Sequence, residues 1–386
     1  MTLFALRCAV RPYAWGSREF IAAMQGRAVP SAGPEAELWI GAHPGDPSRD
    51  EAGRGLDELI ADAPQRLLGA AADRFGARLP YLMKVLAAAS PLSLQAHPDL
   101  DRARSGYAAE DAAGVALDSP ARSYVDRNHK PELLVALTPF DALCGFRPAG
   151  QARELLSAVA VPVLDPVLAD LAARGPVAAV GALLALPRDT AAAAVRAAVN
   201  AADRLPVTEA ALVRRLDAAF PGDVGVLVAL LLAHLTLRPG EGLWVPAGVM
   251  HAYVQGAGIE IMAASDNVLR GGLTGKHVNV PELLAVLADG SAAPMVIAPV
   301  ETGDGVTSWP VPVDDFALHR VQLDGGRHEL ELDGPRLVLC VAGEIVAGGA
   351  DAGAGLVRLG AGSAAFAAAG TRLELSGTGT AFIASA

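Results

Sequence analysis

Apolar and polar side chains alternate over residues 91–98, which read PLSLQAHP. The apolar residues take every second position, and the polar residues between them are Ser93, Gln95 and His97. This period of two is typical of a half-buried strand, because successive side chains of a strand point to opposite faces. The segment therefore predicts a strand whose polar face carries an amide and an imidazole two residues apart.

Other segments before residue 150 show comparable patterns. Apolar and polar residues alternate over 37–41, up to Gly41. Residues 81–89 are apolar apart from Lys84, and residues 132–137 form an apolar run after a polar cluster. Each of these segments predicts a strand. Between the first two, apolar residues recur at helical spacing over 55–75 and predict helix.

The pattern changes near residue 150. Alanine, leucine, valine and arginine dominate residues 150–222 at helical spacing, with prolines between the helical stretches. From residue 235 onward, short strands with glycine turns predict a β-sandwich or small barrel. Segments 235–251 and 356–375 resemble each other and indicate an internal repeat whose second copy lacks the histidine.

We therefore predict a mainly β protein with a helical insertion. The predicted parts are a β domain formed by residues 1–149 and 235–295, a helical insertion over 150–234, and a second β domain without metal ligands over 296–386. We expect the insertion to be structural, and the alternative is a lid over a site elsewhere. A chain of 386 residues is long enough for two or three such units.

Composition narrows the possible partners. The formal net charge is −11, and no Lys/Arg run has the length of a nucleic-acid-binding arm, so nucleic acid is excluded as an expected partner. The three cysteines lie far apart and predict buried thiols in a reducing compartment. Neither a signal peptide nor a membrane span is evident in the sequence. We expect a cytoplasmic protein that is a monomer or a weak homo-oligomer.

Four residues at the predicted ends of strands are candidate metal ligands. Gln95 and His97 come from segment 91–98, Glu132 begins another strand, and His251 follows a turn. Two imidazoles, one carboxylate and one amide oxygen suit zinc and leave a fifth position for water or a substrate oxygen. Any one of these residues alone is better explained as an ordinary polar residue, so the argument depends on the four together.

Charged residues also occur in an unusually apolar stretch after His251. Residues 258–272 place Glu260, Asp266 and Arg270 among apolar neighbours. Buried charges have to be paired or used in chemistry. One interpretation is a functional pocket. The other is an ion-pair network that holds Arg270 to Asp266 or Glu260.

Seven ordered motifs together resemble a known family. They are YAWG, ELWIG, the strand around Lys84, SLQAHP, HKPE, PAGVMHAY and IEIMAASDNVLRGGLT. Taken in order between Tyr13 and Leu284, they closely resemble type I mannose-6-phosphate isomerases, which are zinc enzymes of the cupin superfamily. The resemblance implies two cupin-like β units, the first of them catalytic, and a sugar phosphate as the substrate.

The resemblance also implies roles for individual residues. Gln95, His97, Glu132 and His251 match the zinc ligands, with one zinc ion per chain. The positions that match the substrate pocket are Trp15, Glu37, Lys84, Ser93, Lys130, Tyr253, Glu260, Asp266, Arg270 and Lys276. Gly275 stands where the family often has proline, which predicts a more mobile loop around Lys276.

The implied reaction interconverts mannose 6-phosphate and fructose 6-phosphate through a cis-enediol. Zinc would act as the Lewis acid and Arg270 would stabilise the enediolate. Lys84, Ser93 and Lys276 are the candidate phosphate ligands. The general base remains open among Asp266, Glu260, Lys130 and His129, and we expect desolvation to raise the pKa of both Asp266 and Glu260. Ring opening would be assisted by His97 or Asp266.

Two other functions are compatible with a cupin scaffold. A cupin iron oxygenase would use His97, Glu132 and His251 as a two-histidine, one-carboxylate site, although Gln95 and the cationic pocket argue against it. A non-catalytic sugar-phosphate-binding cupin is the other alternative.

Overall fold

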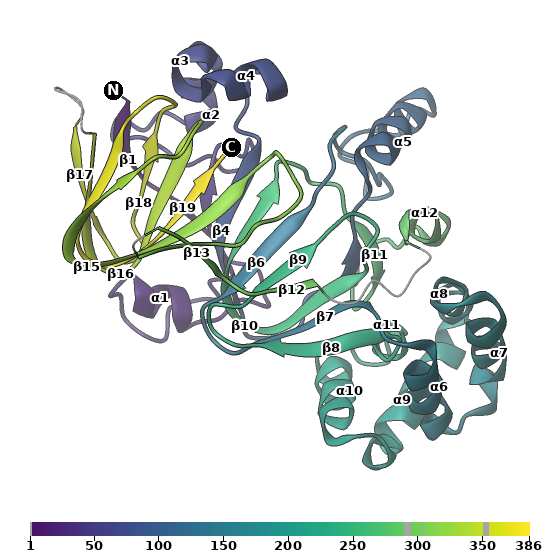
Figure 1. Cartoon of the computed structure of the whole chain (residues 1–386). Helices are drawn as coiled ribbons and strands as arrows, with labels where there is room; N and C mark the ends of the chain where they lie inside the picture. The colour runs from purple at the N-terminus through teal and green to yellow at the C-terminus, as the bar shows by residue number, and fades with distance from the viewer. Residues whose placement is uncertain (1, 289–294, 304, 350–354) are drawn as a thin grey trace.

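The computed structural model describes residues 2–288, 295–303, 305–349 and 355–386. Within them, the chain forms two antiparallel sheets side by side and a group of helices at the far end of the larger sheet (Figure 1). The expected fold class, mainly β with a helical part, is confirmed. How the chain divides into domains stays a prediction.

The larger sheet contains eleven strands. They are β2 (Ala9–Arg11), β3 (Glu37–Gly41), β4 (Tyr81–Ala88), β5 (Leu94–Ala96), β6 (Glu132–Ala136), β7 (Phe140–Phe146), β8 (Leu232–Leu237), β9 (Gly242–Val245), β10 (His251–Ala263), β11 (Leu269–Gly272) and β12 (Met295–Ile297). One path through it runs β12-β9-β6-β10-β4-β3-β2, and a second group contains β11, β5, β7 and β8. The strand predicted over residues 91–98 is present but shorter, as β5, and His97 directly follows its last residue.

Strand β10 belongs to both groups and joins them. Its first residues pair with β5 and β7, whereas residues 256–263 pair with β4. The strand changes partners at Gly256, which has a φ of 130° and lies against Phe140. A Cβ there would meet backbone and side-chain atoms of Phe140 at 2.7–2.8 Å, so only glycine fits. With this change of partners, both Tyr253 and Glu260 line one cavity, and His251 begins the same strand.

The smaller sheet contains eight strands, and β1 (Leu3–Leu6) is one of them. The others are β13 (Val300–Gly303), β14 (Val306–Ser308), β15 (Ala317–Leu330), β16 (Arg336–Gly349), β17 (Leu356–Gly360), β18 (Ala364–Ala367) and β19 (Leu373–Ser385). Leu3 pairs with Ala367 and Leu6 with Ala364. The chain's first strand thus completes the C-terminal sheet, which the sequence pattern did not predict.

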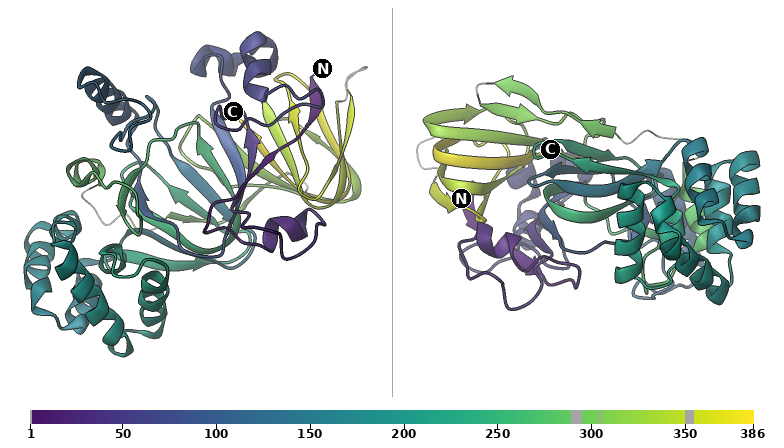
Figure 2. Two further views of the ribbon diagram at one scale, coloured as in Figure 1. Left: turned by 180° about the vertical axis from the view of Figure 1, so that it is seen from behind. Right: turned by 90° about the horizontal axis from the view of Figure 1, so that it is seen from below.

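One apolar core lies between the two sheets. It includes Tyr81 and Ile259 from the larger sheet and Phe366 and Phe382 from the smaller one. The Tyr81 hydroxyl lies 2.8 Å from the carbonyl oxygen of Pro335. The sheets are therefore joined by buried contacts as well as by the chain. Figure 2 shows the two sheets next to each other from two further directions.

The predicted helical segment is helical in the structure. Between β7 and β8 lie α6 (Ala149–Val159), α7 (Asp165–Arg174), α8 (Pro176–Leu184), α9 (Arg188–Asn200), α10 (Val207–Ala219) and α11 (Gly225–Ala229), with 3₁₀ turns at Pro162–Leu164 and Ala202–Arg204. Their apolar faces share a core with β5, β10 and β11. In the described residues no single helix is long and apolar enough to span a membrane, and α8 and α9 reach that length only as a pair bent by 117°.

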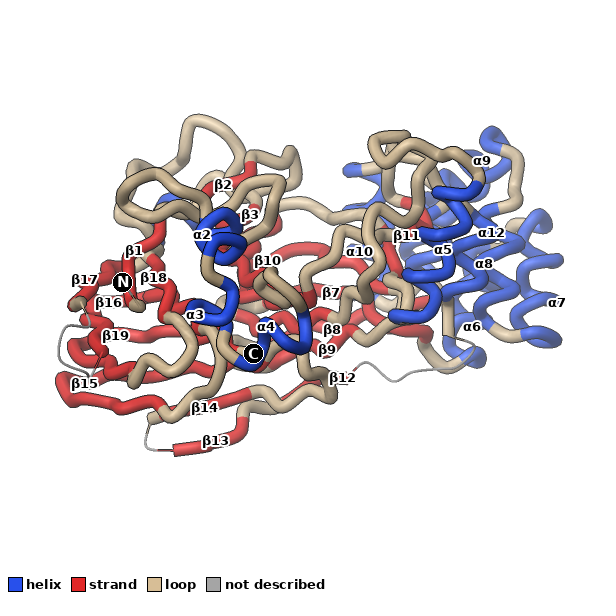
Figure 3. The backbone as a smooth tube through the Cα atoms, turned by 90° about the horizontal axis from the view of Figure 1, so that it is seen from above, coloured by secondary structure: helices blue, strands red, loops and turns tan. Residues whose placement is uncertain are grey.

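The remaining helices lie around the sheets (Figure 3). They are α1 (Phe20–Met24), α2 (Leu56–Asp62), α3 (Pro64–Leu68), α4 (Ala70–Phe75), α5 (Leu100–Ala112) and α12 (Val280–Val286). The helical spacing over 55–75 corresponds to α2, α3 and α4. Arg102 of α5 forms an ion pair with Glu282 of α12, which fixes the two helices to each other.

Candidate metal centre and substrate cavity

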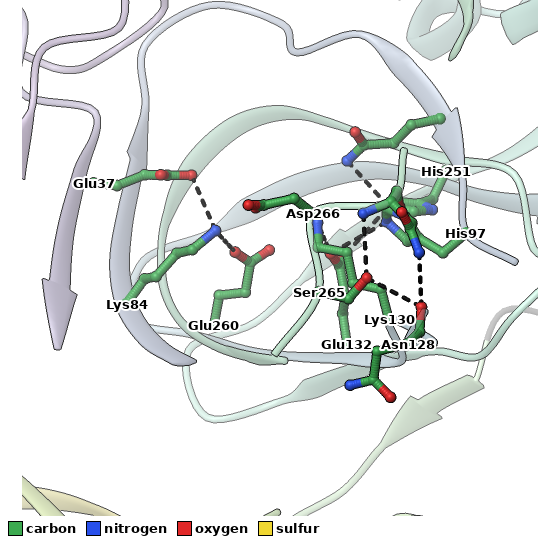
Figure 4. A network of polar contacts seen from close by, with 12 residues as sticks. Glu37, Lys84, His97, Asn128, Lys130, Glu132, His251, Glu260, Ser265 and Asp266 are labelled. Carbon is green, nitrogen blue, oxygen red and sulfur yellow. Dashed lines mark hydrogen bonds and ion pairs between the residues drawn. The ribbon is translucent and has the colours of Figure 1, made fainter. Parts of the chain in front are cut away.

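Three of the four predicted metal ligands converge in the interior. One ligand atom from each of His97, Glu132 and His251 lies within 4.8 Å of the other two. The two histidines are fully buried and Glu132 is 1% exposed. They come from the end of β5, the start of β6 and the start of β10, so three distant segments form the cluster (Figure 4).

Sheet register explains why these residues meet. Gln95 lies opposite His251 on β10 and opposite Arg270 on β11. Residues directly opposite each other point to the same face, so His251, Gln95 and Arg270 form a row across three strands about 4.8 Å apart. Alternation along β5 places His97 on the face that Gln95 occupies.

Backbone carbonyls fix the orientation of both imidazoles. His97 Nδ1–H donates to the carbonyl of Asn267 at 2.8 Å, and His251 Nδ1–H donates to the carbonyl of Val249 at 3.1 Å. With the proton on Nδ1, each ring turns an unprotonated Nε2 toward Glu132. Such partners on the far nitrogen are typical of metal-ligating histidines.

The chemistry of this cluster fits a divalent metal ion. In the described part of the chain, His97 Nε2 and Glu132 Oε2 are buried without a hydrogen-bond partner. Buried polar atoms without partners are costly, and a cation would provide one for both. Burial, together with the Lys130 charge, lowers the pKa of His97 to about 4, so its ring is neutral at pH 7. Burial alone would raise the pKa of Glu132, but the Lys130 ammonium holds it well below its usual range.

Gln95, the fourth predicted ligand, adjoins the cluster through its amide group. Its Nε2 lies 3.3 Å from His251 Nε2. An amide's oxygen and nitrogen exchange places when the group rotates by 180°, so this side chain can present its oxygen at the same point.

The other predicted site residues line one cavity of about 710 Å³. Gln95 and Glu132 open onto it, whereas His97 and His251 lie behind them. The predicted catalytic and substrate-binding residues in its wall are Trp15, Glu37, Lys84, Ser93, Lys130, Tyr253, Glu260, Asp266, Arg270 and Lys276. The structure thus brings these residues and the candidate metal ligands together, whereas the candidate base His129 lies elsewhere.

A buried ion-pair network forms part of this wall. Lys84 Nζ lies 3.0 Å from Glu260 Oε2 and 3.5 Å from Glu37 Oε1 (Figure 4). Burial alone would lower the pKa of Lys84, but the charges of Glu260 and Glu37 raise it above its ordinary value. Burial raises the pKa of Glu260, and the Lys84 charge offsets part of that rise. This ammonium is therefore engaged by carboxylates, which argues against the expectation that Lys84 binds phosphate.

Arg270 and Lys276 differ from Lys84 in having no carboxylate partner. In the described residues, neither side chain forms an ion pair or a side-chain hydrogen bond, so the alternative of a network between Arg270 and Asp266 or Glu260 is wrong. The Arg270 charge, with some burial, lowers the pKa of Lys276. Two adjacent cations in a cavity wall make an attractive site for an anion.

The expectation of a raised pKa fails for Asp266. Burial alone would raise it, but a hydrogen bond from His43 and nearby positive charges lower the pKa below its usual value. His43 Nε2–H donates to Asp266 Oδ2 at 2.9 Å, and Gly45 N–H donates to His43 Nδ1. Asp266 is thus held ionised.

His129 lies outside the cavity, in contrast to its neighbour Lys130. Its Nε2 lies 3.0 Å from Asp315 Oδ2, in the segment before β15. Because His129 contacts Asp315 and does not line the cavity, the structure argues against it as the general base. Lys130 Nζ lies 2.8 Å from Glu132 Oε1, beside the candidate metal.

Several supporting residues were missed by the sequence analysis. Asn267 is one of them: its amide oxygen accepts from Val125 N–H, and its amide nitrogen donates to the Asn128 carbonyl. The Asn267 side chain thus holds the segment before Glu132, while the Asn267 backbone carbonyl orients His97. Phe220, at the end of α10, lines the cavity as well. No local signal marked His43 or Phe220, because each acts across a long sequence separation.

Comparisons with known proteins agree with this geometry. Residues 3–149 match the family model of the phosphomannose isomerase type I catalytic domain. The chain is 38% identical over 344 residues to the mannose-6-phosphate isomerase of Escherichia coli K12, covering 87% of this chain and 88% of that protein. It is 32% identical over 386 residues to the human mannose-6-phosphate isomerase, covering 89% and 88%.

Solved structures extend the similarity over the whole chain. A zinc-bound mannose 6-phosphate isomerase superimposes with a TM-score of 0.90 at 36% identity, covering 100% of this chain and 99% of the other. A variant of the phosphomannose isomerase of Salmonella typhimurium gives 0.91 at the same identity and coverage. This chain belongs to the type I phosphomannose isomerase family.

Proposed function

We propose that this chain is a mannose-6-phosphate isomerase that interconverts mannose 6-phosphate and fructose 6-phosphate with one bound zinc ion. The observation that carries the proposal is the convergence of His97, Glu132 and His251 beside a cavity of about 710 Å³. Buried atoms without partners in that cluster call for a cation. The cavity is large enough for a sugar phosphate, and the cationic side chains of Arg270 and Lys276 in its wall support phosphate binding there.

His97, Glu132 and His251 would hold the zinc ion, with the Gln95 oxygen as a further ligand. When bound, zinc acts as a Lewis acid that lowers the cost of negative charge on the substrate's carbonyl and hydroxyl oxygens, an effect of several kcal/mol. Lys130 holds the Glu132 carboxylate in place through its contact at 2.8 Å.

Glu260 is the group that we assign as general base. It lines the cavity, and burial raises its pKa toward the range in which a carboxylate transfers protons at neutral pH. Lys84 orients it through the contact at 3.0 Å. His43 keeps Asp266 ionised. We assign to Asp266 the removal of the proton from the sugar hydroxyl during ring opening. Lys130 remains the alternative base.

Arg270 and Lys276 supply the positive charge that the substrate phosphate requires. Glu37, Glu132 and Glu260 carry three negative charges against the two ammonium groups of Lys84 and Lys130, so this part of the cavity repels a dianion before metal binds. The phosphate therefore binds at Arg270 and Lys276. From its row beside Gln95, Arg270 also stabilises the enediolate.

The remaining predicted residues would contact the sugar. Tyr253 has a buried hydroxyl without a hydrogen-bond partner among the described residues, and it lines the cavity. Ser93 and Trp15 line the cavity too, and Trp15 stacks against Tyr13. A free hydroxyl and an aromatic face are suited to sugar hydroxyls and a sugar ring, respectively.

A coupled assay for fructose 6-phosphate formed from mannose 6-phosphate tests the proposal. The zinc-loaded protein should convert the substrate without consuming oxygen, and Arg270→Ala should lower turnover with zinc still bound. A zinc-loaded protein that forms no fructose 6-phosphate would refute the proposed activity. Oxygen uptake with bound iron would instead favour the oxygenase alternative.

A further inference from the structure

The loop that follows β11 has an unusual backbone. Gly272 has a φ of 125°, and Leu273 has a φ of 53° although it is not glycine. A leucine adopts the left-handed region only when its surroundings hold it there. Lys276 lies three residues further on, so this backbone decides where one of the cations in the cavity wall is placed.

Asp223, in the helical segment, provides three hydrogen bonds at this point. Its Oδ1 accepts from Leu273 N–H at 2.9 Å and from Gly225 N–H at 2.7 Å, and its Oδ2 accepts from Thr274 N–H at 3.2 Å. Asp223 lies between α10 and α11, and α11 contacts β11 (Figure 1). One carboxylate thus ties the helical segment to a loop 50 residues later in the sequence.

Close backbone packing accompanies these hydrogen bonds. A Cβ on Gly272 would lie 2.7 Å from Gly225 Cα, and a Cβ on Gly225 would lie 2.6 Å from Leu273 N. Two facing glycines therefore allow the backbones to approach until the Asp223 carboxylate can reach both chains. The Asp223 hydrogen bonds thus depend on the close approach of the backbone at Gly225 and Gly272.

Beyond that crossing the loop has little other support. Thr274 and Gly275 line the substrate cavity on one side and a second cavity of about 530 Å³ on the other. A Cβ on Gly275 would meet nothing within 4 Å. The Leu273 side chain is buried in the core of the helical segment, but Thr274 and Gly275 have open space on both sides. The Asp223 hydrogen bonds therefore fix the backbone at the point where the loop leaves that core.

We propose that Asp223 is a positioning residue that holds the Leu273–Thr274 backbone, and thereby Lys276, at the phosphate-binding end of the cavity. The helical segment then has a role in substrate binding, to which Phe220 in the cavity wall also contributes. The inference rests on the proposed function, because it assigns the phosphate to Arg270 and Lys276.

Asp223→Asn tests the inference, since the amide keeps the shape of the side chain but loses one acceptor and the charge. We expect the KM for mannose 6-phosphate and the inhibition constant of inorganic phosphate both to rise about tenfold, with kcat changed by less than about threefold. Bound zinc should not change. Hydrogen exchange of the Leu273 and Thr274 amides should become faster.

Asp217→Asn is the matched control. Asp217 Oδ1 accepts from Gly222 N–H at 2.9 Å in the same turn but does not contact the loop. This variant should leave the KM and the phosphate inhibition constant unchanged. If the turn had a purely structural role, the KM and the phosphate inhibition constant would change equally in both variants. That result would overturn the inference.

Lys276→Met separates failure of the inference from failure of the proposed function. If Lys276→Met weakens phosphate binding while a folded Asp223→Asn does not, Asp223 has no positioning role. If Lys276→Met itself leaves phosphate binding unchanged, the proposed phosphate site is wrong. In the unmodified protein, unprotected exchange of the Leu273 and Thr274 amides would contradict the inference whether or not any variant folds.

Discussion

Lysine occurs at only three positions in this chain, and all three lysines line the same cavity. Lys84, Lys130 and Lys276 are the lysines among 31 Lys and Arg residues, so every basic residue elsewhere is arginine. Lysine offers a compact point charge on a flexible stem, whereas arginine offers a broad planar fork. In a chain whose other cationic side chains are arginines, Lys84 and Lys130 stand where a compact cation fits beside carboxylates, and Lys276 stands where we propose that the phosphate binds.

Loss of the Lys84 ammonium should destabilise the protein. Lys84→Met leaves Glu37 and Glu260 buried without their cation, and we expect a decrease of about 3 kcal/mol in the free energy of unfolding, measured in urea. Arg54→Met, at an exposed pair with Asp62, is the control and should cost less than about 1 kcal/mol. Equal losses of unfolding free energy in the two variants would mean that the buried network stabilises the protein no more than an exposed ion pair does.

The pH dependence of stability in the wild type and in Lys84→Met is a second test. Carboxylates raise the pKa of Lys84 in the folded state above its ordinary value of 10.5. Its contribution to stability is therefore complete below pH 10.5 and is lost as the pH rises beyond that value. The difference in unfolding free energy between wild type and Lys84→Met should shrink above pH 10.5. A difference that grows there would contradict the assigned direction.

His251 should be essential for both metal and turnover. His251→Ala removes an imidazole whose Nε2 faces Glu132, and we expect loss of bound zinc and a fall in kcat of at least about 100-fold. Metal analysis and the coupled assay measure the two effects. His234→Ala, at a histidine on β8 outside the cavity, should retain both. Turnover by a zinc-free His251→Ala would overturn the metal's role.

Among the elements, β10 does most to assemble the site. It carries His251, Tyr253 and Glu260, and it changes partner strands at Gly256. Gly256→Ala should lower the free energy of unfolding by about 2 kcal/mol, because its φ is 130° and the new Cβ would meet Phe140. Chemical denaturation measures this effect.

Gly26→Ala is the matched control for that substitution. Gly26 also has a positive φ, of 64°, but a Cβ there would meet nothing within 4 Å. Gly26→Ala should lower the free energy of unfolding by about 1 kcal/mol, because it adds backbone strain without a steric clash. If both variants lose the same stability, close packing at the bend of β10 is not important.

Local patterns predicted the elements better than the contacts between them. Alternation placed Gln95 and His97 on one face of a strand, and the structure has them there. The pairing of Gln95 with Arg270 could not be foreseen, because strand register between residues 95 and 270 depends on the whole sheet. Asp223 and His43 were missed for the same reason. Each acts on a loop that only the fold brings near.

In the whole molecule, segments far from the metal cluster in the sequence contribute to the cavity or contact residues beside it. The helical segment contributes Phe220 to the cavity wall, and Asp315, before β15, binds His129 next to Lys130. The first strand closes the C-terminal sheet by pairing with β18. A centre assembled from such distant segments forms only when the whole chain folds, so the composition of any one segment could not reveal it.

Zinc titration shows whether one metal ion held by His97, Glu132 and His251 supports isomerisation. The protein would be stripped with a chelator and titrated with zinc, while bound metal and fructose 6-phosphate formation are measured on the same samples. Activity should rise in proportion to bound zinc and reach its plateau at one ion per chain. Full turnover in the stripped protein, or a plateau unrelated to bound metal, would contradict the account.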